Sequence, residues 1–315
     1  MRLTLRQLQI FLAIAESGST TTAATTLSLT QSATSAALNQ LESLLGAGLF
    51  DRIGRRLMLN DSGRALLPQA RHLLDAAADV EQQFAKPGKG AGRLRVGTST
   101  TIGNYLMPGL LAAYQRDADV SQIRVRIANT EEIVTAVANL QLDIGFIEGP
   151  CHDDHLTTQQ WIKDELVVFA SSTHPLCKKR GRIKLDELQK ASWLLREPGS
   201  GTREAVERAL RPHLRRMHSG VSFGDSEAIK RAVAAGLGIS CLSRWVVADM
   251  LRHQTLKELD TTLPPISRMF HIVRHPQKHL SRNLDQLVQF SLRWPRMLVA
   301  DTTAPMKRDR IRAQD

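Results

Sequence analysis

The sequence contains few cysteines and no long hydrophobic run. Three cysteines, Cys151, Cys177 and Cys241, lie far apart in 315 residues, which argues against a disulfide framework and favours a reduced compartment. No apolar stretch reaches the roughly 18 residues that a membrane-spanning helix needs. Residues 1–15 are interrupted by polar side chains and precede no small-residue cleavage site, unlike a signal peptide. We therefore expect a cytoplasmic protein that does not contact a membrane.

Several motifs that carry catalysis are also absent. The sequence has no G-x-x-x-x-G-K-[ST], no G-x-S-x-G and no H-E-x-x-H. Ser200 lies within Gly-Ser-Gly, but nothing in the sequence places a base beside it. We therefore predict that the protein is not an enzyme and has no catalytic residues.

One short run contains side chains that could bind a metal. Residues 151–155 read Cys-His-Asp-Asp-His and follow Gly149-Pro150, so they form a turn. Structural zinc sites usually draw on two separated pairs of ligands, and no second pair is evident. We predict no metal and no cofactor, and we leave a redox role of Cys151 open because nothing nearby fixes its pKa.

The net charge of +11 suggests a nucleic-acid partner, but its distribution does not locate the binding site. Residues 1–60 carry five basic and three acidic side chains, whereas residues 91–300 carry 29 and 21. The local pattern of residues must therefore identify any DNA-binding segment.

Residues 1–60 have the pattern of a winged helix-turn-helix. An amphipathic helix over 4–15 precedes a short helix that Ser19 caps, and after a tight connection Thr30 caps a third helix over 31–45. Two short strands, 49–50 and 57–59, enclose a basic hairpin. A helix over 63–85 and a Gly-rich segment over 86–92 follow. We predict a linker helix and hinge at 61–91.

The start of the third helix should meet base edges in the major groove, because this is how a helix-turn-helix reads DNA. The hairpin tip should meet phosphates or the minor groove. Taken singly, hydroxyl side chains could merely cap the helix and arginines could merely be solvated; their combination favours DNA binding. The predicted DNA-contacting residues are Thr30, Gln31, Ser32, Thr34, Ser35, Arg52, Arg55 and Arg56.

After the hinge, strands and helices alternate, which predicts α/β lobes with doubly wound sheets. The segment 130–137, which leads into a strand at 143–146, is repeated at 226–233, which leads into 238–241. We infer two similar lobes with a cleft between them. We place the effector domain at 92–300, with lobe I at about 92–166 plus 267–300 and lobe II at about 167–266. A basic, flexible tail would occupy 301–315.

Hydroxyl-rich loops precede a helix in each lobe and should face the cleft, where helix N-termini and glycine can bind an anion. Glu148 should enter the same cleft and would repel an anion unless one of the two holds a proton or a cation joins them. It therefore favours a ligand with a donor, such as bisulfite or a small acid carrying an amine or hydroxyl. The alternatives are that the hydroxyls only cap helices and that Glu148 only bonds backbone amides. The candidate effector residues are Thr98, Ser99, Thr100, Thr101, Glu148, Ser200, Gly201 and Thr202. Asn129-Thr130 and Asp225-Ser226 should be structural caps.

The N-terminal pattern resembles that of the LysR-type transcriptional regulators. The matching residues are Leu5-Arg6-Gln7-Leu8 with Phe11, Ala23-Ala24 with Leu27, Gln31-Ser32-Ala33 with Ser35, and Leu49-Phe50 with Arg52. The resemblance continues through the two-lobed, periplasmic-binding-protein-like domain, and within the family it favours the YeiE-type branch. Thr30 and Thr34 depart from the usual Ser and Val, which affects the expected base preference and not the fold.

The resemblance implies several partners. The linker helix would pair two subunits, the assembly would be a homotetramer on near-palindromic promoter DNA, and RNA polymerase would be a further partner. The effector would lie between the lobes, and the branch favours a sulfite-like oxyanion. A solute-binding sensor is the alternative for residues 92–300, but it leaves residues 1–60 without a use; an enzyme is the weaker alternative.

Overall fold

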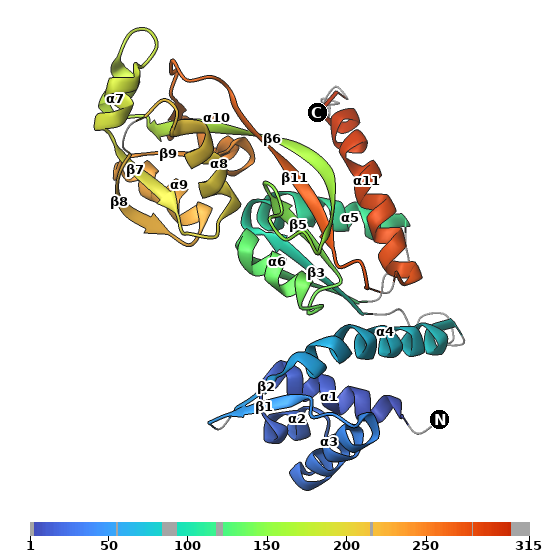
Figure 1. Cartoon of the computed structure of the whole chain (residues 1–315). Coiled ribbons are helices and arrows are strands. Elements are labelled where there is room, and N and C mark those ends of the chain that lie inside the picture. Colours follow the sequence, from blue (N-terminus) through green and yellow to red (C-terminus); the bar gives the residue numbers. More distant parts are fainter. Residues whose placement is uncertain are drawn as a thin grey trace, which may run out of the picture.

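The computed structural model describes residues 3–54, 56–83, 93–117, 122–214, 217–278 and 280–303. Figure 1 shows an N-terminal domain and a larger α/β domain, with one long helix, α4, between them. The predicted Gly-rich segment over 86–92, Arg55 and residues 304–315 of the predicted tail lie outside the described residues. The N-terminal elements are α1 (Leu5–Ser17), α2 (Thr20–Thr26), α3 (Gln31–Leu45), β1 (Phe50–Ile53), β2 (Arg56–Leu59) and α4 (Asp61–Gln83).

The helix boundaries of the N-terminal domain follow from local capping. The Thr4 side chain accepts a hydrogen bond from the Gln7 amide in a capping box, and Ser19 and Thr30 cap α2 and α3. Gly18 ends α1 in the left-handed region, where glycine has no steric penalty. The three predicted helices are therefore confirmed.

The core of this domain forms where α1 and α3 meet the hairpin of β1 and β2, which we call the wing. Phe11 and Leu41 are fully buried, together with Leu49 at the start of the wing. The wing is tied to α1 because the Leu57 amide donates to the Gly18 carbonyl at 2.9 Å. This packing fixes α3 and the wing relative to each other.

The α/β domain is built on a mixed sheet. Among the described residues the strand order is β4-β3-β5-β11-β6-β9-β7-β8, with β10 beside β6. The strands are β3 (Arg93–Ser99), β4 (Gln122–Ala128), β5 (Ile144–Glu148), β6 (Thr157–Ser171), β7 (Ser192–Arg196), β8 (His218–Phe223), β9 (Ile239–Ser243), β10 (Leu256–Glu258) and β11 (Ile266–Arg274). The helices are η1 (Ile102–Leu106), α5 (Met107–Asp117), α6 (Thr130–Ala138), η2 (Pro175–Lys178), α7 (Leu185–Lys190), α8 (Gly201–Leu210), α9 (Ser226–Ala234), α10 (Arg244–Arg252) and α11 (Arg282–Thr303).

Two long strands connect the lobes. Strands β6 and β11 pair antiparallel along their length, and β11 also pairs antiparallel with β5 in lobe I, as β6 does with β9 in lobe II. The outer strands β4, β3 and β5, and likewise β9, β7 and β8, run parallel. The predicted α/β fold class is confirmed, and the antiparallel crossing strands β6 and β11 make the sheet mixed. The lobe boundaries proposed at 166/167 and 266/267 fall within β6 and β11.

The internal repeat corresponds to equivalent elements in the two lobes. Asn129 caps α6 and Asp225 caps α9, so the expected structural caps are confirmed. Each repeated helix buries one face on the sheet, through Ile133 in lobe I and Ile229 in lobe II.

Across the described residues, no helix is both long and apolar enough to cross a membrane.

Candidate functional site

The two lobes touch where the N-termini of α6 and α8 meet at the end of β5, and we call this contact the lobe junction. The Glu131 amide donates to the Gly199 carbonyl of the other lobe at 3.1 Å. A Cβ atom at Gly201 would lie 1.8 Å from the Glu148 carbonyl oxygen and 2.7 Å from Thr130 Oγ1. Only glycine permits this close approach, so the sequence allows the lobes to close at this point.

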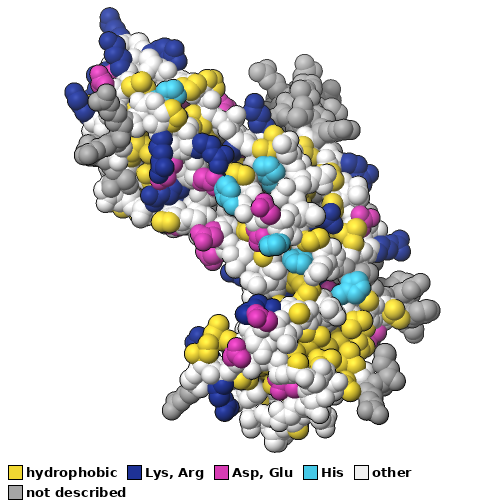
Figure 2. All heavy atoms as spheres, viewed as in Figure 1, with side chains coloured by type: hydrophobic (Ala, Val, Ile, Leu, Met, Phe, Trp, Pro, Cys, Tyr) yellow, Lys and Arg dark blue, Asp and Glu magenta, His cyan; other side chains and the backbone are white. Residues whose placement is uncertain are grey.

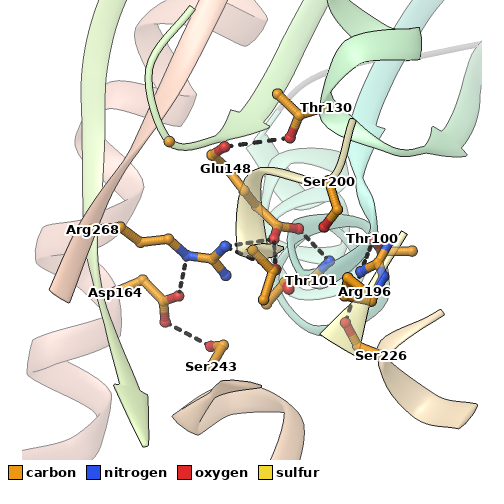
Figure 3. A network of polar contacts seen from close by, with 12 residues as sticks. Thr100, Thr101, Thr130, Glu148, Asp164, Arg196, Ser200, Ser226, Ser243 and Arg268 are labelled. Atoms are coloured by element: carbon orange, nitrogen blue, oxygen red, sulfur yellow. Dashed lines mark hydrogen bonds and ion pairs between the residues drawn. The ribbon is translucent and has the colours of Figure 1, made fainter. Parts of the chain in front are cut away.

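Glu148, at the end of β5, lies at the centre of a buried polar network (Figure 3). Its Oε1 accepts from the Thr101 amide at 2.6 Å, and its Oε2 accepts from Thr202 Oγ1 at 2.6 Å. The Arg268 Nη1 atom lies 2.8 Å from Oε2. Burial would raise the pKa of Glu148, but Arg268, Thr202 and the Thr101 amide together hold it below its usual value. Glu148 is therefore a paired carboxylate that joins the lobes.

Arg268 bridges this carboxylate to a second one on β6. Its Nε donates to Asp164 Oδ2 at 2.8 Å, and Ser243 Oγ donates to Asp164 Oδ1 at 2.6 Å. Burial raises the pKa of Asp164 despite the neighbouring guanidinium. We call Glu148, Arg268 and Asp164 the buried triad; it carries two carboxylates for one guanidinium.

A second buried guanidinium comes from the end of β7. Arg196 Nη1 donates to Thr100 Oγ1 of lobe I at 2.9 Å and to Ser226 Oγ of lobe II at 2.8 Å. Its Nε and Nη2 pair with Glu197 at 2.7 and 2.8 Å. Arg196 therefore connects lobe II to residues 98–101 of lobe I, which we call the hydroxyl loop.

The predicted effector residues come together at this junction, although with different roles. Thr100, Thr101, Glu148 and Thr202 all have protein partners. Ser200 caps α8 by accepting from the Arg203 amide. The hydroxyls of Thr98 and Ser99 are buried and have no hydrogen-bond partner among the described residues, as is also true of Arg268 Nη2.

The expectation that Glu148 requires a ligand with a donor is not supported. Its oxygens already accept from a backbone amide, a hydroxyl and a guanidinium, as the alternative reading anticipated for backbone amides. Thr98 lies on the same face of the sheet as Glu148 and Arg268, because Thr98 is in register with Phe146 and Glu148 with Phe270. Since successive strand residues face opposite sides, Ser99 faces the other side from Thr98.

A groove of about 700 Å³ opens beside the junction, between α6 and α8. It is bordered by Thr130 and Ser200 but by none of the residues 98–101. Arg203 and Arg211 along it pair with Glu207, and His152 lies 2.9 Å from Glu204. Residues 98–101 of the predicted effector set therefore do not line this groove.

The predicted DNA-contacting residues divide by exposure. Thr30, Gln31 and Ser32 are exposed at the start of α3, and Ser35 is half-buried and accepts from Gln31 Nε2. Arg52 and Arg56 are exposed on the wing. Thr34 is a correction: its side chain is fully buried and its hydroxyl donates to the Thr30 carbonyl, so it packs inside the domain.

The Cys151–His155 run forms no metal-binding cluster within the part of the chain that the structure describes. His152 lies 2.9 Å from Glu204 across the lobes, and Cys151 Sγ donates to the Asp153 carbonyl. Burial raises the pKa of the Cys151 thiol, which disfavours the reactive thiolate.

Comparisons with known proteins agree with this architecture. Residues 5–64 match the model of the bacterial regulatory helix-turn-helix protein, lysR family, and residues 87–296 match the LysR substrate binding domain. The chain belongs to the LysR family. It is a DNA-binding transcriptional regulator with an effector-binding domain and not an enzyme.

Relatives and solved structures cover most of the chain. YeiE of Escherichia coli K12, an HTH-type transcriptional regulator, is 46% identical over 92% of this chain and 97% of its own length. A full-length OxyR variant from Pseudomonas aeruginosa has a similar fold, with a TM-score of 0.72, 24% identity and coverage of 93% and 95% of the two chains. The regulatory domain of CcmR from Synechocystis, solved with 2-PG, is 30% identical and covers 64% of this chain and 96% of its own, with a TM-score of 0.59.

Sequence reasoning missed the buried charges of this LysR-family site. Arg196 and Arg268 lie in largely apolar strands, whereas Asp164 lies between Lys163 and Glu165; each of the three is almost fully buried. A lone charge within an apolar run is a signal for a buried pair, since an unpaired buried charge is costly. The pairing of Arg268 with Glu148 and Asp164 could not be identified because these carboxylates come from other strands, far apart in the sequence.

Replacing Arg268 with methionine tests the buried triad. Arg268→Met leaves two buried carboxylates unpaired, so we expect the free energy of unfolding to fall by about 3–5 kcal/mol. Arg244→Met is the matched control, because Arg244 also pairs with two carboxylates, Glu165 and Glu258, but at the surface. It should cost about 1 kcal/mol or less. Urea denaturation of the full chain measures both, and equal losses would contradict the assignment.

Proposed function

We propose that this LysR-family chain binds promoter DNA sequence-specifically and that a small oxyanion held at the lobe junction modulates the binding. The observation that carries the proposal is the pair of buried polar atoms, Ser99 Oγ and Arg268 Nη2, that lack partners among the described residues. Buried donors are normally paired, so each of these unpaired donors favours a ligand that accepts from it.

The chemistry of the junction restricts the ligand class. The closed lobes and the close Gly201 contact favour a small molecule, and the N-termini of α6 and α8 favour a negative charge. Sulfite is our candidate because the YeiE-type resemblance favours it. The CcmR domain solved with 2-PG, a relative at 30% identity, supports a small-molecule effector in this fold.

The buried triad has one more carboxylate than guanidinium, so an added anion would be repelled unless a proton accompanies it. The proton could remain on the ligand or bind to Asp164, whose pKa burial already raises. We therefore expect oxyanion binding to take up a proton and to tighten as the pH falls.

Ser99→Ala separates a ligand contact from a structural role. Because the Ser99 hydroxyl is unpaired, its removal should leave the melting temperature of the free protein unchanged or higher. Sulfite binding should weaken about tenfold, since one charge-assisted hydrogen bond is lost. Calorimetry in two buffers of different ionisation enthalpy measures the affinity and the proton uptake together.

Ser267→Ala, at an exposed position of β11, is the control and should bind sulfite normally. Undiminished binding by Ser99→Ala, or binding by the wild type that releases a proton, would refute this account of the junction.

The DNA contacts should come from the exposed residues at the start of α3 and from the wing. Gln31 can form two hydrogen bonds to adenine, and the Ser32 and Thr30 hydroxyls lie beside it. Arg52 and Arg56 would contact the backbone or the minor groove, and Arg55 between them lies outside the described residues. Contacts in one subunit are few, so useful affinity requires several subunits on one site.

Gln31→Ala should weaken binding to the protein's own upstream DNA by about 1–3 kcal/mol, or roughly fivefold to 150-fold, while non-specific binding stays unchanged. Gln40→Ala is the control, because Gln40 is exposed farther along the same helix. Gel-shift titrations at fixed salt compare the two. The proposal fails if the wild type gives no specific shift, and the assignment of Gln31 fails if both variants bind alike.

We assign subunit pairing to α4. Leu73 and Val80, seven residues apart and 43% and 58% exposed, lie on its outer side, and Leu5 of α1 is also exposed. Figure 2 shows hydrophobic side chains gathered on this part of the N-terminal domain. A seven-residue apolar spacing is typical of helices that pair, and two such pairs would make the expected tetramer.

Leu73→Asp should dissociate the dimer, because a carboxylate cannot be desolvated in an apolar seam. Leu237→Asp, at a 52% exposed position in lobe II, is the control. Sedimentation velocity should show a smaller species only for Leu73→Asp. An unchanged assembly would place the pairing surface elsewhere.

The regulatory mechanism we propose is a population shift. An effector that binds the closed lobes more tightly than the open ones changes how the DNA-binding domains are presented to the promoter. Because its partner is promoter DNA, we expect the protein to act in the cytoplasm. RNA polymerase would be a further partner at the same promoter.

A further inference from the structure

Strands β3 and β5 connect the lobe junction to the opposite edge of lobe I. They pair in parallel, with Val96 beside Ile144 and Thr98 beside Phe146. Their carboxyl ends carry Ser99 and Glu148 at the junction. Their amino ends therefore lie together on the far side, where Arg95 and Asp143 are located.

At that far side the two strands are tied to each other. Asp143 Oδ2 accepts from the Arg95 backbone amide and Oδ1 from its guanidinium, both at 2.6 Å. Lys278 Nζ lies 2.9 Å from the same carboxylate, and both Asp143 and Lys278 are almost fully buried. Although burial opposes it, Lys278 and Arg95 hold the pKa of Asp143 below its ordinary value, so the carboxylate stays ionised.

Lys278 also reaches out of the effector domain. Its Nζ pairs with Asp75 of α4, the helix that lies between the two domains in Figure 1. One lysine therefore joins the base of β5 to the linker helix through Asp143 and Asp75.

The same helix continues the connection to the DNA-binding domain. Arg71, four residues before Asp75 and so on the same face of α4, pairs with Glu16 of α1 at 3.0 Å. Arg71 is 3% exposed, and its Nε and Nη1 have no hydrogen-bond partner among the described residues. Burial lowers the pKa of Arg71 to about 10, and the charges of Asp75, Asp143 and Arg95 also act on it.

A buried guanidinium with two unpaired groups is costly, so a small displacement of its neighbours can change which carboxylate it pairs with. Arg71 pairs with Glu16 on the DNA-binding side, and one turn along the same helix Asp75 pairs with Lys278, which holds Asp143 on the effector side. Interfaces built on buried ion pairs tend to switch between discrete sets of pairs, because intermediate positions leave charges unpaired.

We propose that Glu16, Arg71, Asp75, Asp143 and Lys278 form an ionic joint that transmits the state of the lobe junction to the DNA-binding domain through β3 and β5. The inference rests on the proposed function, because it takes the lobe junction as the effector site. A displacement of Glu148 at one end of β5 moves Asp143 at the other end, which changes the pairing of Lys278 with Asp75 of the linker helix and of Arg71 with Glu16 of α1.

Amide hydrogen exchange of the full chain, without effector or DNA, tests the joint. Gly201→Ala forces the lobe junction apart, because the added Cβ would lie 1.8 Å from the Glu148 carbonyl. It should speed exchange of the Glu131 amide, which bonds across the junction, and also of α4 amides by about fivefold. Asp75→Asn breaks the joint and leaves the Asp143–Lys278 pair intact. It should speed exchange in α4 and, because coupling is reciprocal, at Glu131.

The double variant Gly201→Ala/Asp75→Asn tests whether the lobe junction and the ionic joint are coupled. If the joint couples the two sites, the effects of Gly201→Ala and Asp75→Asn on α4 are not additive. Gly220→Ala, which adds a Cβ in open space, and Glu81→Gln, which removes an exposed carboxylate from α4, are the controls and should leave both reporters unchanged.

An opened junction with unchanged exchange in α4, or fully additive effects, would overturn the proposal. Should Gly201→Ala fail to fold, an unchanged Glu131 amide in Asp75→Asn overturns it alone. Because the assay contains neither sulfite nor DNA, its outcome is independent of whether the chain binds either one.

Discussion

The fold of the effector domain depends on one guanidinium shared between two buried carboxylates. Arg268 lies on a strand that runs through both lobes and pairs with Glu148 of lobe I and Asp164 of the neighbouring crossing strand. Removing these charges from water is expensive, so each is retained only because the others are present. The same interaction positions the hydroxyl loop, because the Thr101 amide donates to the carboxylate that Arg268 holds. A ligand at the junction therefore meets a preorganised set of donors.

Closure of the lobes and communication with the DNA-binding domain both begin from this arrangement. Gly201 lets α8 approach the end of β5, and β5 carries that position to Asp143 at its other end. Asp143 shares Lys278 with Asp75 of the linker helix. A strand fixed by buried charges at both ends moves as a unit, which makes a discrete change between two arrangements more favourable than a gradual one.

The sequence predicted the elements better than it predicted the contacts between them. Capping residues such as Ser19, Thr30 and Asn129 mark helix starts by local chemistry, and the α3 bounds were predicted as the structure has them. The hydroxyl loops were identified for the same reason. Arg268 and Asp164 were not, since their pairing joins strands far apart in the chain, and Thr34 was misassigned because its burial depends on packing that capping alone does not show.

The most direct measurement is a crystal structure of the full chain grown with sulfite. The account predicts one oxyanion at the lobe junction that accepts a hydrogen bond from Ser99 Oγ, with the triad of Glu148, Arg268 and Asp164 intact. Density for the anion only in the outer groove between α6 and α8, or no bound anion in crystals that contain sulfite, would contradict the claim that the junction is the effector site.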